Sequence, residues 1–345
     1  MHVTDVLVVG GGPIGLATAI EARMAGLSVT VVEPRGVPID KACGEGLMPG
    51  ALAALERLGI DPPGHVIAGI SYQAGDRRVD HAFRHRLGRG VRRTTLHRVL
   101  AERAEAVGVE LVRGTVDALQ QDDDSASARL TDGTTRRAHW LVGADGLHST
   151  VRTEAGLALP VRGTRRFGLR RHFAAAPWNE FVEVHWTPAA ELYVTPVGDG
   201  EVGVAVLGPQ HTDYDEAVRS VPALADRLRD RAITTSTRGA GPFHQRTTAR
   251  TAGRVILVGD ASGYVDAITG EGIRVGLAQA RVAIECIAAG NPARYEREWR
   301  RVTRNFRMLT SGLVALGDSP LRSAIVPLAR SLPGVYGAVV ERLAR

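Results

Sequence analysis

The chain has 345 residues, of which 44% are hydrophobic and 23% are charged. This length is sufficient for two domains or one large two-lobed unit, and the composition is that of an ordinary globular enzyme rather than a disordered or fibrous chain. Cys43 and Cys286 are the only cysteines, which argues against a disulfide framework and fits a reducing cytosol.

The formal net charge is +6, and Lys41 is the only lysine, so almost all basic residues are arginines. Such a bias is typical of a GC-rich genome. An alternative interpretation is a basic surface that attracts the phosphates of NADPH or an anionic lipid. The sequence has no basic stripe interleaved with aromatic residues and no nucleic-acid module, so we expect no nucleic-acid partner.

No segment of the chain has the pattern of a targeting or membrane-spanning sequence. The chain enters a predicted strand within about four residues of Met1, so we expect no signal peptide. No apolar run reaches the roughly 18–20 residues that a membrane span needs. We therefore expect a cytoplasmic protein without a transmembrane segment, for which peripheral membrane contact stays open.

The first predicted elements form a βαβ unit. Asp5–Val9 is a short valine-rich run that predicts a buried parallel strand. The helical spacing of Pro13–Ala25 ends before Gly26, and Ser28–Val32 follows as the next strand. The lengths of these three segments are those of a βαβ unit.

Helices and strands alternate over the next hundred residues. Pro49–Leu58 and Thr94–Val107 predict helices, and the alternating polarity of Ile70–His85 predicts strands. Further strands are predicted at Glu110–Arg113 and Trp140–Ala144, and a hairpin joined by the acidic loop Asp122–Asp124 is predicted at Val116–Gln121 and Ser127–Leu130.

Four short strands at regular spacing then indicate an antiparallel sheet: Gly168–Phe173, Phe181–Trp186, Glu191–Pro196 and Glu201–Leu207. A helix, a buried strand and a long helix are predicted next: Tyr214–Arg229, Arg254–Val258 and Gly272–Ala289. We expect Asn291–Arg345 to form further helices, broken at Pro320, Pro327 and Pro333.

A glycine motif lies between the first strand and the first helix. In Gly10-Gly11-Gly12-Pro13-Ile14-Gly15, the first glycine permits a tight turn and Gly12 lets the backbone approach a pyrophosphate. Gly15 allows close packing of helix on strand, and the helix N-terminus attracts phosphate. Glu33 ends the second strand, where a carboxylate accepts hydrogen bonds from ribose hydroxyls and repels a 2′-phosphate. This pattern favours FAD or NAD over NADP at this site.

Two further glycine-rich segments follow in order. Val142–Arg152 contains Asp145-Gly146 after a predicted strand, with Ser149 placed to cap the next segment and Arg152 placed to meet a phosphate or Asp145. Val258–Gly263 contains Gly259-Asp260-Ala261, and Thr269-Gly270-Glu271-Gly272-Ile273 begins a helix. The N-terminus of that helix can stabilise negative charge.

The ordered set of three motifs resembles the fingerprints of the FAD-dependent class A flavoprotein monooxygenases, to which geranylgeranyl reductases and flavin-dependent halogenases are related. The resemblance implies that the Asp145 region bridges flavin and nicotinamide cofactor, that Asp260 accepts from ribityl hydroxyls, and that Gly270–Ile273 faces the isoalloxazine. Halogenases carry a Trp-x-Trp-x-Ile-Pro signature, whereas Leu192–Pro196 lacks both tryptophans, which argues against halogenation.

Other candidate site residues also follow from the resemblance. Lys41-Ala42-Cys43-Gly44-Glu45-Gly46 resembles a flavin-contacting loop of geranylgeranyl reductases, in which Lys41 would meet flavin oxygens. Cys43 has no base beside it in sequence, so we do not expect a nucleophile. An arginine at the position of Arg93 contacts FAD in the superfamily, although Arg86, Arg89 and Arg92 are rivals. Tyr193 would either lie over the substrate or pack within the sheet.

We therefore expect an α/β protein in which a Rossmann-type FAD-binding lobe is interleaved with an antiparallel β-sheet substrate lobe, followed by C-terminal helices. This arrangement resembles the para-hydroxybenzoate hydroxylase fold. The expected FAD lobe comprises residues 1–70, 95–160 and 245–290, the substrate lobe 71–94 and 161–244, and the helical segment 291–345.

The expected function is that of an FAD-dependent oxidoreductase, with NAD(P)H as reductant and no metal. The resemblance favours a monooxygenase that hydroxylates a small or lipidic aromatic substrate through a C4a-hydroperoxyflavin, with no side chain acting as nucleophile. The alternative is reduction of a C=C bond by reduced FAD, as in geranylgeranyl reductases; a flavin-binding protein without turnover is a third class. The substrate, the choice of NADH or NADPH and the oligomeric state do not follow from the sequence.

The C-terminal segment mixes arginines with apolar runs such as Leu313–Leu316 and Ala324–Leu328. One interpretation is a lid that touches a membrane surface or a lipidic substrate. The other is helical packing on the FAD lobe with a basic outer face, and the pattern favours this second interpretation.

Overall fold

Valine-rich strands form the first sheet of the protein, whose computed structural model describes residues 3–161 and 165–344. The strand order is β19-β20-β11-β1-β2-β8, and the pairs from β20 to β8 are parallel. The bounds are β19 Thr251–Ala252, β20 Val255–Leu257, β11 Thr135–Gly143, β1 Thr4–Val9, β2 Val29–Glu33 and β8 Glu110–Arg113. The hairpin β9 (Val116–Gln121) and β10 (Ala126–Leu130) joins the sheet through β11.

Both faces of this sheet are covered, which explains why the strands β1, β2 and β20 are mostly apolar. Val6 and Val8 pack into a core with helices on one face, whereas Leu7 and Val9 pack into a second core on the other face. The helices of the first core are α1 Pro13–Met24, α2 Pro49–Arg57, α3 Arg93–Ala106, α7 Gly272–Ala288 and the first turns of α8 Tyr295–Gly317. The hairpin and α4 (Thr150–Glu154) cover the opposite face.

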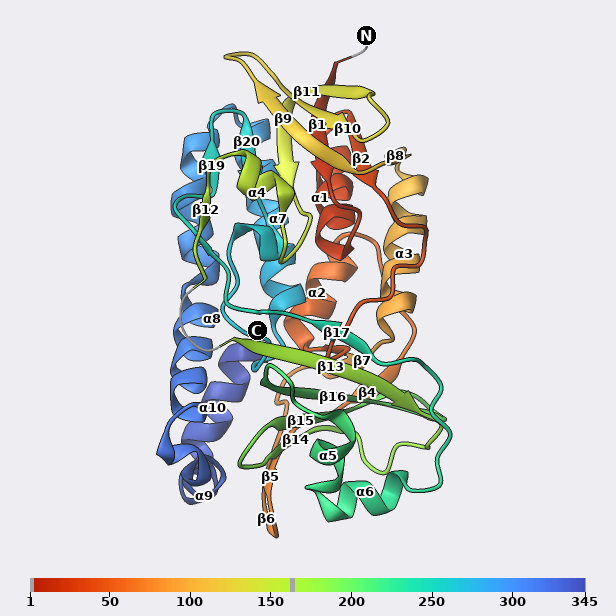
Figure 1. Ribbon diagram of the computed structural model, residues 1–345, viewed down its shortest axis with the longest axis vertical. Coiled ribbons are helices and arrows are strands. Elements are labelled where there is room, and N and C mark those ends of the chain that lie inside the picture. The colour runs from red at the N-terminus through yellow and green to blue at the C-terminus, as the bar shows by residue number, and fades with distance from the viewer. Residues whose placement is uncertain (1–2, 162–164, 345) are drawn as a thin grey trace.

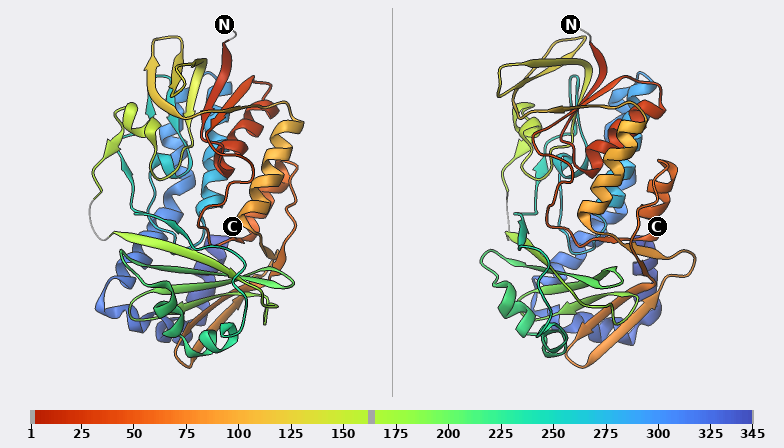
Figure 2. Two further views of the ribbon diagram at one scale, coloured as in Figure 1. Left: turned by 45° about the vertical axis from the view of Figure 1, so that its right-hand side comes forward. Right: turned by 90° about the vertical axis from the view of Figure 1, so that its right-hand side faces the viewer.

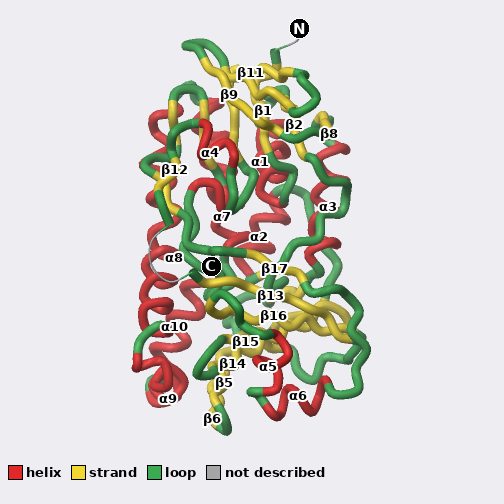
Figure 3. The backbone as a smooth tube through the Cα atoms, viewed as in Figure 1, coloured by secondary structure: helices red, strands yellow, loops and turns green. Residues whose placement is uncertain are grey.

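A second sheet lies below the first in Figure 1, and Figure 3 shows the strands gathered in these two places. Its order is β17-β13-β16-β15-β14-β5-β6, and all pairs are antiparallel except β14 with β5. The bounds are β17 Arg238–Ala240, β13 Arg166–Phe173, β16 Glu201–Pro209, β15 Glu191–Gly198, β14 Phe181–Trp186, β5 Gly69–Ala74 and β6 Arg77–Ala82.

The second sheet also has two distinct faces. Leu192 and Val194 pack toward the short helices α5 (Tyr214–Arg219) and α6 (Pro222–Leu228), whereas Tyr193 between them belongs to another core on the opposite face. This alternation with a period of two is that of a strand covered on both sides. Small ladders complete the strands: β3 Gly46–Leu47, β7 Gly88–Gly90 and β4 His65–Ile67, and β12 Ala158–Leu159 with β18 Arg246–Thr247.

The C-terminal helices connect the two sheet regions. α8 (Tyr295–Gly317) runs along one side of the molecule, and α9 and α10 lie at its end beside the second sheet (Figures 1 and 2). α9 spans Ile325–Ser331 and α10 spans Pro333–Ala344; short 3-10 turns occur at η1 Gly259–Ser262, η2 Pro292–Arg294 and η3 Pro320–Ala324. The interleaved α/β architecture expected from the sequence is therefore confirmed, whereas the residue boundaries of the lobes stay a prediction.

Two sequence-based predictions about helices are wrong. The single helix expected at Tyr214–Arg229 is two helices, because Pro222 begins α6 after the non-helical Val221 (φ −117°, ψ 89°). Pro327 does not break a helix, because it lies in the first turn of α9, where a missing N–H costs no hydrogen bond. Pro320 and Pro333 do stand at helix starts, and β11 begins five residues before the predicted Trp140.

A buried ionic group joins the second sheet to the segment after η1. Arg166 of β13 donates from Nε to Asp266 over 3.0 Å and pairs through its terminal nitrogen with Glu191 of β15. All three side chains are at most 5% exposed. Removing one partner of such a group leaves uncompensated buried charge, which is costly.

We predict that Arg166→Met lowers the free energy of unfolding by about 3–5 kcal/mol, because the buried carboxylate of Asp266 loses its counter-charge and that of Glu191 keeps only Arg322. Urea unfolding at neutral pH measures this change. Arg78→Met is the matched control, since Arg78 pairs with Asp80 at the surface and such pairs contribute about 0–1 kcal/mol. Equal losses in the two variants would contradict the prediction.

Candidate functional site

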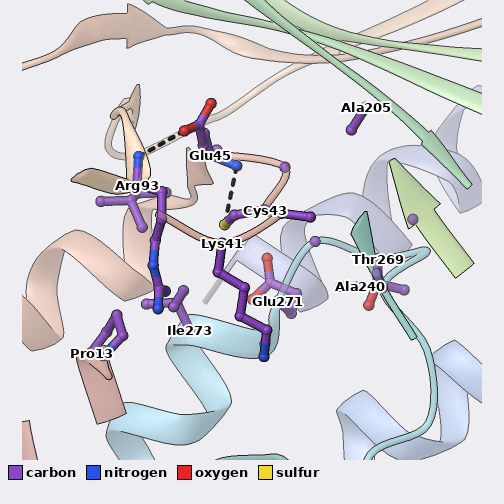
Figure 4. Close-up of a pocket in the computed structure, with 18 of the residues that line it drawn as sticks. Pro13, Lys41, Cys43, Glu45, Arg93, Ala205, Ala240, Thr269, Glu271 and Ile273 are labelled. Carbon is purple, nitrogen blue, oxygen red and sulfur yellow. Dashed lines mark hydrogen bonds between the residues drawn. The ribbon is translucent and has the colours of Figure 1, made fainter. Parts of the chain in front are cut away.

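A cavity of about 260 Å³ lies between the carboxyl ends of the parallel strands and the second sheet. Open α/β sheets bind their ligands at this end of the strands. Figure 4 shows part of the cavity wall. Seventeen of the sequence-predicted cofactor residues line it: Gly10, Gly12, Pro13, Ile14, Glu33, Lys41, Cys43, Gly44, Arg93, Asp145, Gly146, Gly259, Asp260, Gly270, Glu271, Gly272 and Ile273.

The glycine motif forms a tight turn between β1 and α1. Gly10 has φ +104°, and a Cβ there would lie 2.6 Å from the carbonyl oxygen of Ala144. Gly15 does not line the cavity: a Cβ at this position would lie 1.8 Å from the Gly10 oxygen, so its role is the close packing of α1 against the turn. At Gly12 the nearest atom to a Cβ would be an Arg93 nitrogen at 3.8 Å, which leaves the N-terminus of α1 open to a ligand.

Arg93 differs from its three neighbouring arginines in having no carboxylate partner among the described residues. Arg86 pairs with Glu56, Arg89 with Asp61 and Arg92 with Glu201. Arg93 is buried at the head of α3, its Nε has no hydrogen-bond partner, and burial lowers its pKa. A buried guanidinium beside Gly12 is chemically suited to an anion such as pyrophosphate.

Glu33 ends β2 at the cavity edge. Its carboxylate accepts from the Gly11 backbone N–H over 2.8 Å and from the side chain of Arg35 over 2.7 Å. Burial acts to raise the pKa of Glu33, but these hydrogen bonds and the charge of Arg35 outweigh it and lower the pKa. Glu33 is therefore an ionised acceptor at neutral pH, as recognition of ribose hydroxyls requires.

Asp145 stabilises its own turn. It accepts hydrogen bonds from the Ser149 hydroxyl at 2.5 Å and from the Val151 N–H at 3.0 Å, while burial raises its pKa. Ser149 caps α4, as the sequence predicts, by accepting from the Arg152 N–H. Arg152 donates its side-chain hydrogen bonds to Leu147, Gln245 and Ala261 rather than to Asp145, and so connects the second motif to the third.

Three separate segments meet at Lys41. Its Nζ lies 3.9 Å from an oxygen of Asp260, and a Cβ on Gly146 would lie 3.5 Å from the same nitrogen. Both Lys41 and Asp260 are about one-third exposed, which leaves a cation and an anion at the cavity wall. Gly259 has φ +60° and donates its N–H to Gln279 of α7 over 2.6 Å.

The loop that contains Cys43 contacts the second sheet through a Glu45–His172 pair, which the sequence did not predict. Glu45 has φ +61°, and its buried carboxylate lies 2.5 Å from Nε2 of His172 in β13. Its other oxygen accepts from the Arg93 N–H over 2.7 Å. Cys43 accepts from the Glu45 N–H, and burial raises the pKa of its thiol, so it is no thiolate nucleophile at neutral pH.

Glu271 immediately precedes α7 and lies in the cavity wall, as Figure 4 shows. Glu271 is 2% exposed. One oxygen of its carboxylate accepts a hydrogen bond from Arg274 over 2.5 Å, and the other oxygen has no hydrogen-bond partner. Burial raises the pKa of Glu271 to about 7, against the effect of Arg274. Over the described ranges, no group of three or more His, Cys, Asp and Glu side chains is placed to hold a metal ion.

Beyond these polar residues the cavity continues as an apolar chamber. Tyr193 lines it, but its hydroxyl donates to the Ile268 carbonyl over 2.6 Å, so only the ring is available to a ligand. Most other chamber residues come from the second sheet and α10: Ile70, Tyr72, Phe83, Val182, Val184, Ala205, Leu207, Phe243, Val340 and Leu343.

The family of this chain follows from comparison with known proteins. The model of the FAD binding domain family matches residues 3–290. The chain therefore belongs to the FAD binding domain family of FAD-dependent oxidoreductases, which includes monooxygenases.

Named relatives include both hydroxylating and reducing enzymes. The chain is 30% identical to the rifampicin monooxygenase of Rhodococcus hoagii, over 80% of this chain and 62% of that protein. It is 30% identical to the menaquinone reductase of Mycobacterium tuberculosis, over 84% of this chain and 78% of that protein. The solved p-nitrophenol 4-monooxygenase of Pseudomonas putida shares the fold with a TM-score of 0.81 at 20% identity, over 99% of this chain and 98% of that one.

The residues at the cavity are suited to FAD, the cofactor of the family. The unpaired Arg93 and the open N-terminus of α1 provide a place for the pyrophosphate, and the ionised Glu33 provides one for the adenosine ribose. Which atoms each residue contacts stays a prediction from the sequence.

Loss of the unpaired arginine should weaken cofactor retention. We predict that Arg93→Met raises the dissociation constant of FAD by about 10- to 100-fold, because a charge-assisted hydrogen bond to phosphate is lost. Titration of flavin-free protein, followed by quenching of flavin fluorescence, measures this constant. Arg86→Met is the matched control, because Arg86 already pairs with Glu56 at the surface; a similar loss in both variants would contradict the assignment.

Glu271 should make stability depend on pH. Its pKa of about 7 in the folded protein lies above the ordinary value of 4.5, so ionisation destabilises the fold as pH rises from about 4.5 through 7. We predict that flavin-free Glu271→Gln and wild type are equally stable near pH 4, below both pKa values, and that the variant is about 3 kcal/mol more stable at pH 8. Urea unfolding across this range tests the prediction. Glu285→Gln, at an exposed ion pair on the same helix, should track wild type at every pH.

Proposed function

We propose that this protein is an NAD(P)H-dependent monooxygenase that hydroxylates a small or lipidic aromatic substrate. The observation that carries the proposal is the chamber beyond the cofactor residues, which is walled almost entirely by apolar and aromatic side chains. Such a wall favours an apolar ring and excludes water from the reacting atoms. The chain spans 62% of the length of the rifampicin monooxygenase relatives, so the activity is inferred from the site rather than transferred from them.

The tyrosines that line the chamber do not supply a base. Tyr193 donates its hydroxyl to the Ile268 carbonyl. Burial raises the pKa of Tyr72 and Tyr193 above the ordinary value for a phenol, so neither acts as a base at neutral pH. These residues orient a substrate by shape, and the reaction needs no protein nucleophile.

When bound, FAD would supply the redox chemistry, which is hydride acceptance from the nicotinamide cofactor and activation of oxygen. The protein would hold the pyrophosphate near Arg93 and the ribityl chain near Asp260. The N-terminus of α7, with Gly272 and Ile273 at the cavity, would stabilise negative charge that develops on the ring. The spacing Gly-x-Gly-x-x-Gly occurs a second time at Gly198–Gly203, but there it lies across the turn from β15 to β16 and does not begin a helix. NAD(P)H would therefore reach the flavin through the cavity and not through a second nucleotide-binding βαβ unit.

The alternative is reduction of a C=C bond, which a specific observation favours. Glu271 has a pKa of about 7 and stands at the cavity wall. Reduction of a C=C bond needs a hydride on one carbon and a proton on the other, and a carboxylic acid that keeps its proton near neutral pH can supply the proton. The Thr269–Ile273 segment also resembles that of geranylgeranyl reductases, and menaquinone reductases are among the relatives.

Rapid mixing distinguishes the two reactions. We predict that anaerobically reduced holoprotein mixed with oxygen and a candidate phenol gives a transient near-ultraviolet band that belongs to neither oxidised nor reduced FAD, followed by hydroxylated product. Direct return to oxidised FAD, combined with anaerobic oxidation of the reduced protein by menaquinone and formation of the C=C-reduced product, would support the alternative. Failure of NADH and NADPH to reduce the flavin would contradict the NAD(P)H-dependent monooxygenase. Failure of electron-transfer proteins as well would contradict both reactions and favour a flavin-binding protein without turnover.

A further inference from the structure

The C-terminal helices carry an apolar surface that faces solvent. We call it the outer C-terminal face, and it consists of Leu321, Leu328, Leu332, Val335 and Val339. The exposed fractions of these residues lie between 37% and 61%. Five large apolar residues exposed within nineteen positions is unusual, because scattered single residues are the norm on a protein surface.

These residues lie on the exposed parts of adjoining elements. Leu321 is in the 3-10 turn η3 and Leu328 is in α9. Val335 and Val339 are four positions apart on α10 and so share one side of that helix, and Leu332 is the non-helical residue that precedes it. The two helical segments, Pro320–Ser331 and Pro333–Ala344, meet at an angle of 101°, and Leu332 stands at the junction. Figure 1 shows α9 at the lower left corner of the molecule and α10 running from it toward the middle, where the C-terminus lies.

Within Pro320–Ala344 the exposed charges have one sign. Between Pro320 and Ala344 the only acidic residue is Glu341, and it is buried, where it contacts His81 and accepts from the Arg84 N–H over 3.0 Å. Arg330 and Arg342 are exposed. Exposed apolar side chains beside exposed arginines are complementary to anionic lipid headgroups above acyl chains.

The opposite side of the same helices is packed into the protein. Ile325, Val326, Tyr336 and Val340 belong to the core beside the second sheet. No single helix among the described residues is long and apolar enough to cross a membrane, although the bent pair passes the same test of length and composition. Because the inner side is part of the core, the pair is suited to lying along a membrane interface and not to crossing it.

The inner side of α10 also closes the apolar chamber. Val340, Leu343 and Ala344 line the cavity, while Val335 and Val339 of the same helix face solvent. One helix therefore separates the chamber from the outer C-terminal face. A lipid surface seated on that face would lie one helix diameter, about 10 Å, from the chamber wall.

We propose that the outer C-terminal face docks this protein on the surface of an anionic lipid bilayer, with α9 and α10 in the plane of the interface. The proposal rests on the surface of the C-terminal helices and holds whichever reaction the flavin site performs. Apolar side chains enter the headgroup region, and Arg330 and Arg342 meet the anionic headgroups.

Vesicle flotation with the holoprotein tests the proposal. We expect wild type to float with phosphatidylcholine vesicles that contain about 30% phosphatidylglycerol, and to bind pure phosphatidylcholine vesicles about tenfold less. Leu328→Asp and Val335→Asp should each reduce binding to the anionic vesicles by about tenfold or more, and Arg330→Gln should reduce it about fivefold. The flavin spectrum and thermal melting of each variant report whether it is folded.

Leu111→Asp is the matched control, because Leu111 is 44% exposed on β8, far along the chain from this face. It should bind vesicles as wild type does. Equal binding of Val335→Asp and wild type would overturn the proposal, as would equal binding to both vesicle types. A wild-type dimer in light scattering that Leu328→Asp dissociates, with no vesicle binding, would show that a second copy of the chain covers the face instead.

Discussion

The close approach of the Gly10 backbone to Ala144 and Asp145 is the constraint on which the site depends. No side chain fits at position 10, since its Cβ would lie within 2.7 Å of backbone atoms from the end of β11. This contact holds the ends of β1 and β11 together and sets the first two motifs side by side. Arg152 then connects the second motif to the Asp260 segment through carbonyl groups. The part of the cavity wall that these three motifs form therefore depends on backbone contacts, and a side chain at position 10 would disrupt them.

The sequence was sufficient for features that depend on neighbours close in the chain. The glycine turn, the acid at Glu33 and the Ser149 cap follow local rules, and the structure places them as those rules predict. Long-range partners were not accessible in this way. Glu45 meets His172 across 127 positions, and no pattern in either segment indicates the other. Arg93 could not be separated from Arg86, Arg89 and Arg92 until the carboxylates that neutralise those three were placed.

The helix errors have a similar origin. The apolar spacing of Tyr214–Arg229 continues across Pro222, so periodicity alone joined two helices that the backbone separates. The chamber residues were missed because each strand of the second sheet contributes only alternate side chains to it. Tyr193 faces the chamber, whereas Leu192 and Val194 face the opposite core. Which of the two sides faces the cavity depends on the packing of α5, α6 and α10, and no single strand encodes it.

The single lysine of this sequence gives the site an unusual chemical property. Lys41 is one-third exposed and lies at the cavity wall beside Asp260. Amine-reactive reagents that modify this chain have therefore only one side chain to label, and it stands where the cofactor is expected to bind. A bound cofactor would cover that amine and slow its acylation, so the rate of acylation reports whether the cavity is occupied without any flavin signal. A peptide map with one possible labelled side chain would follow occupancy of the site in a mixture of proteins.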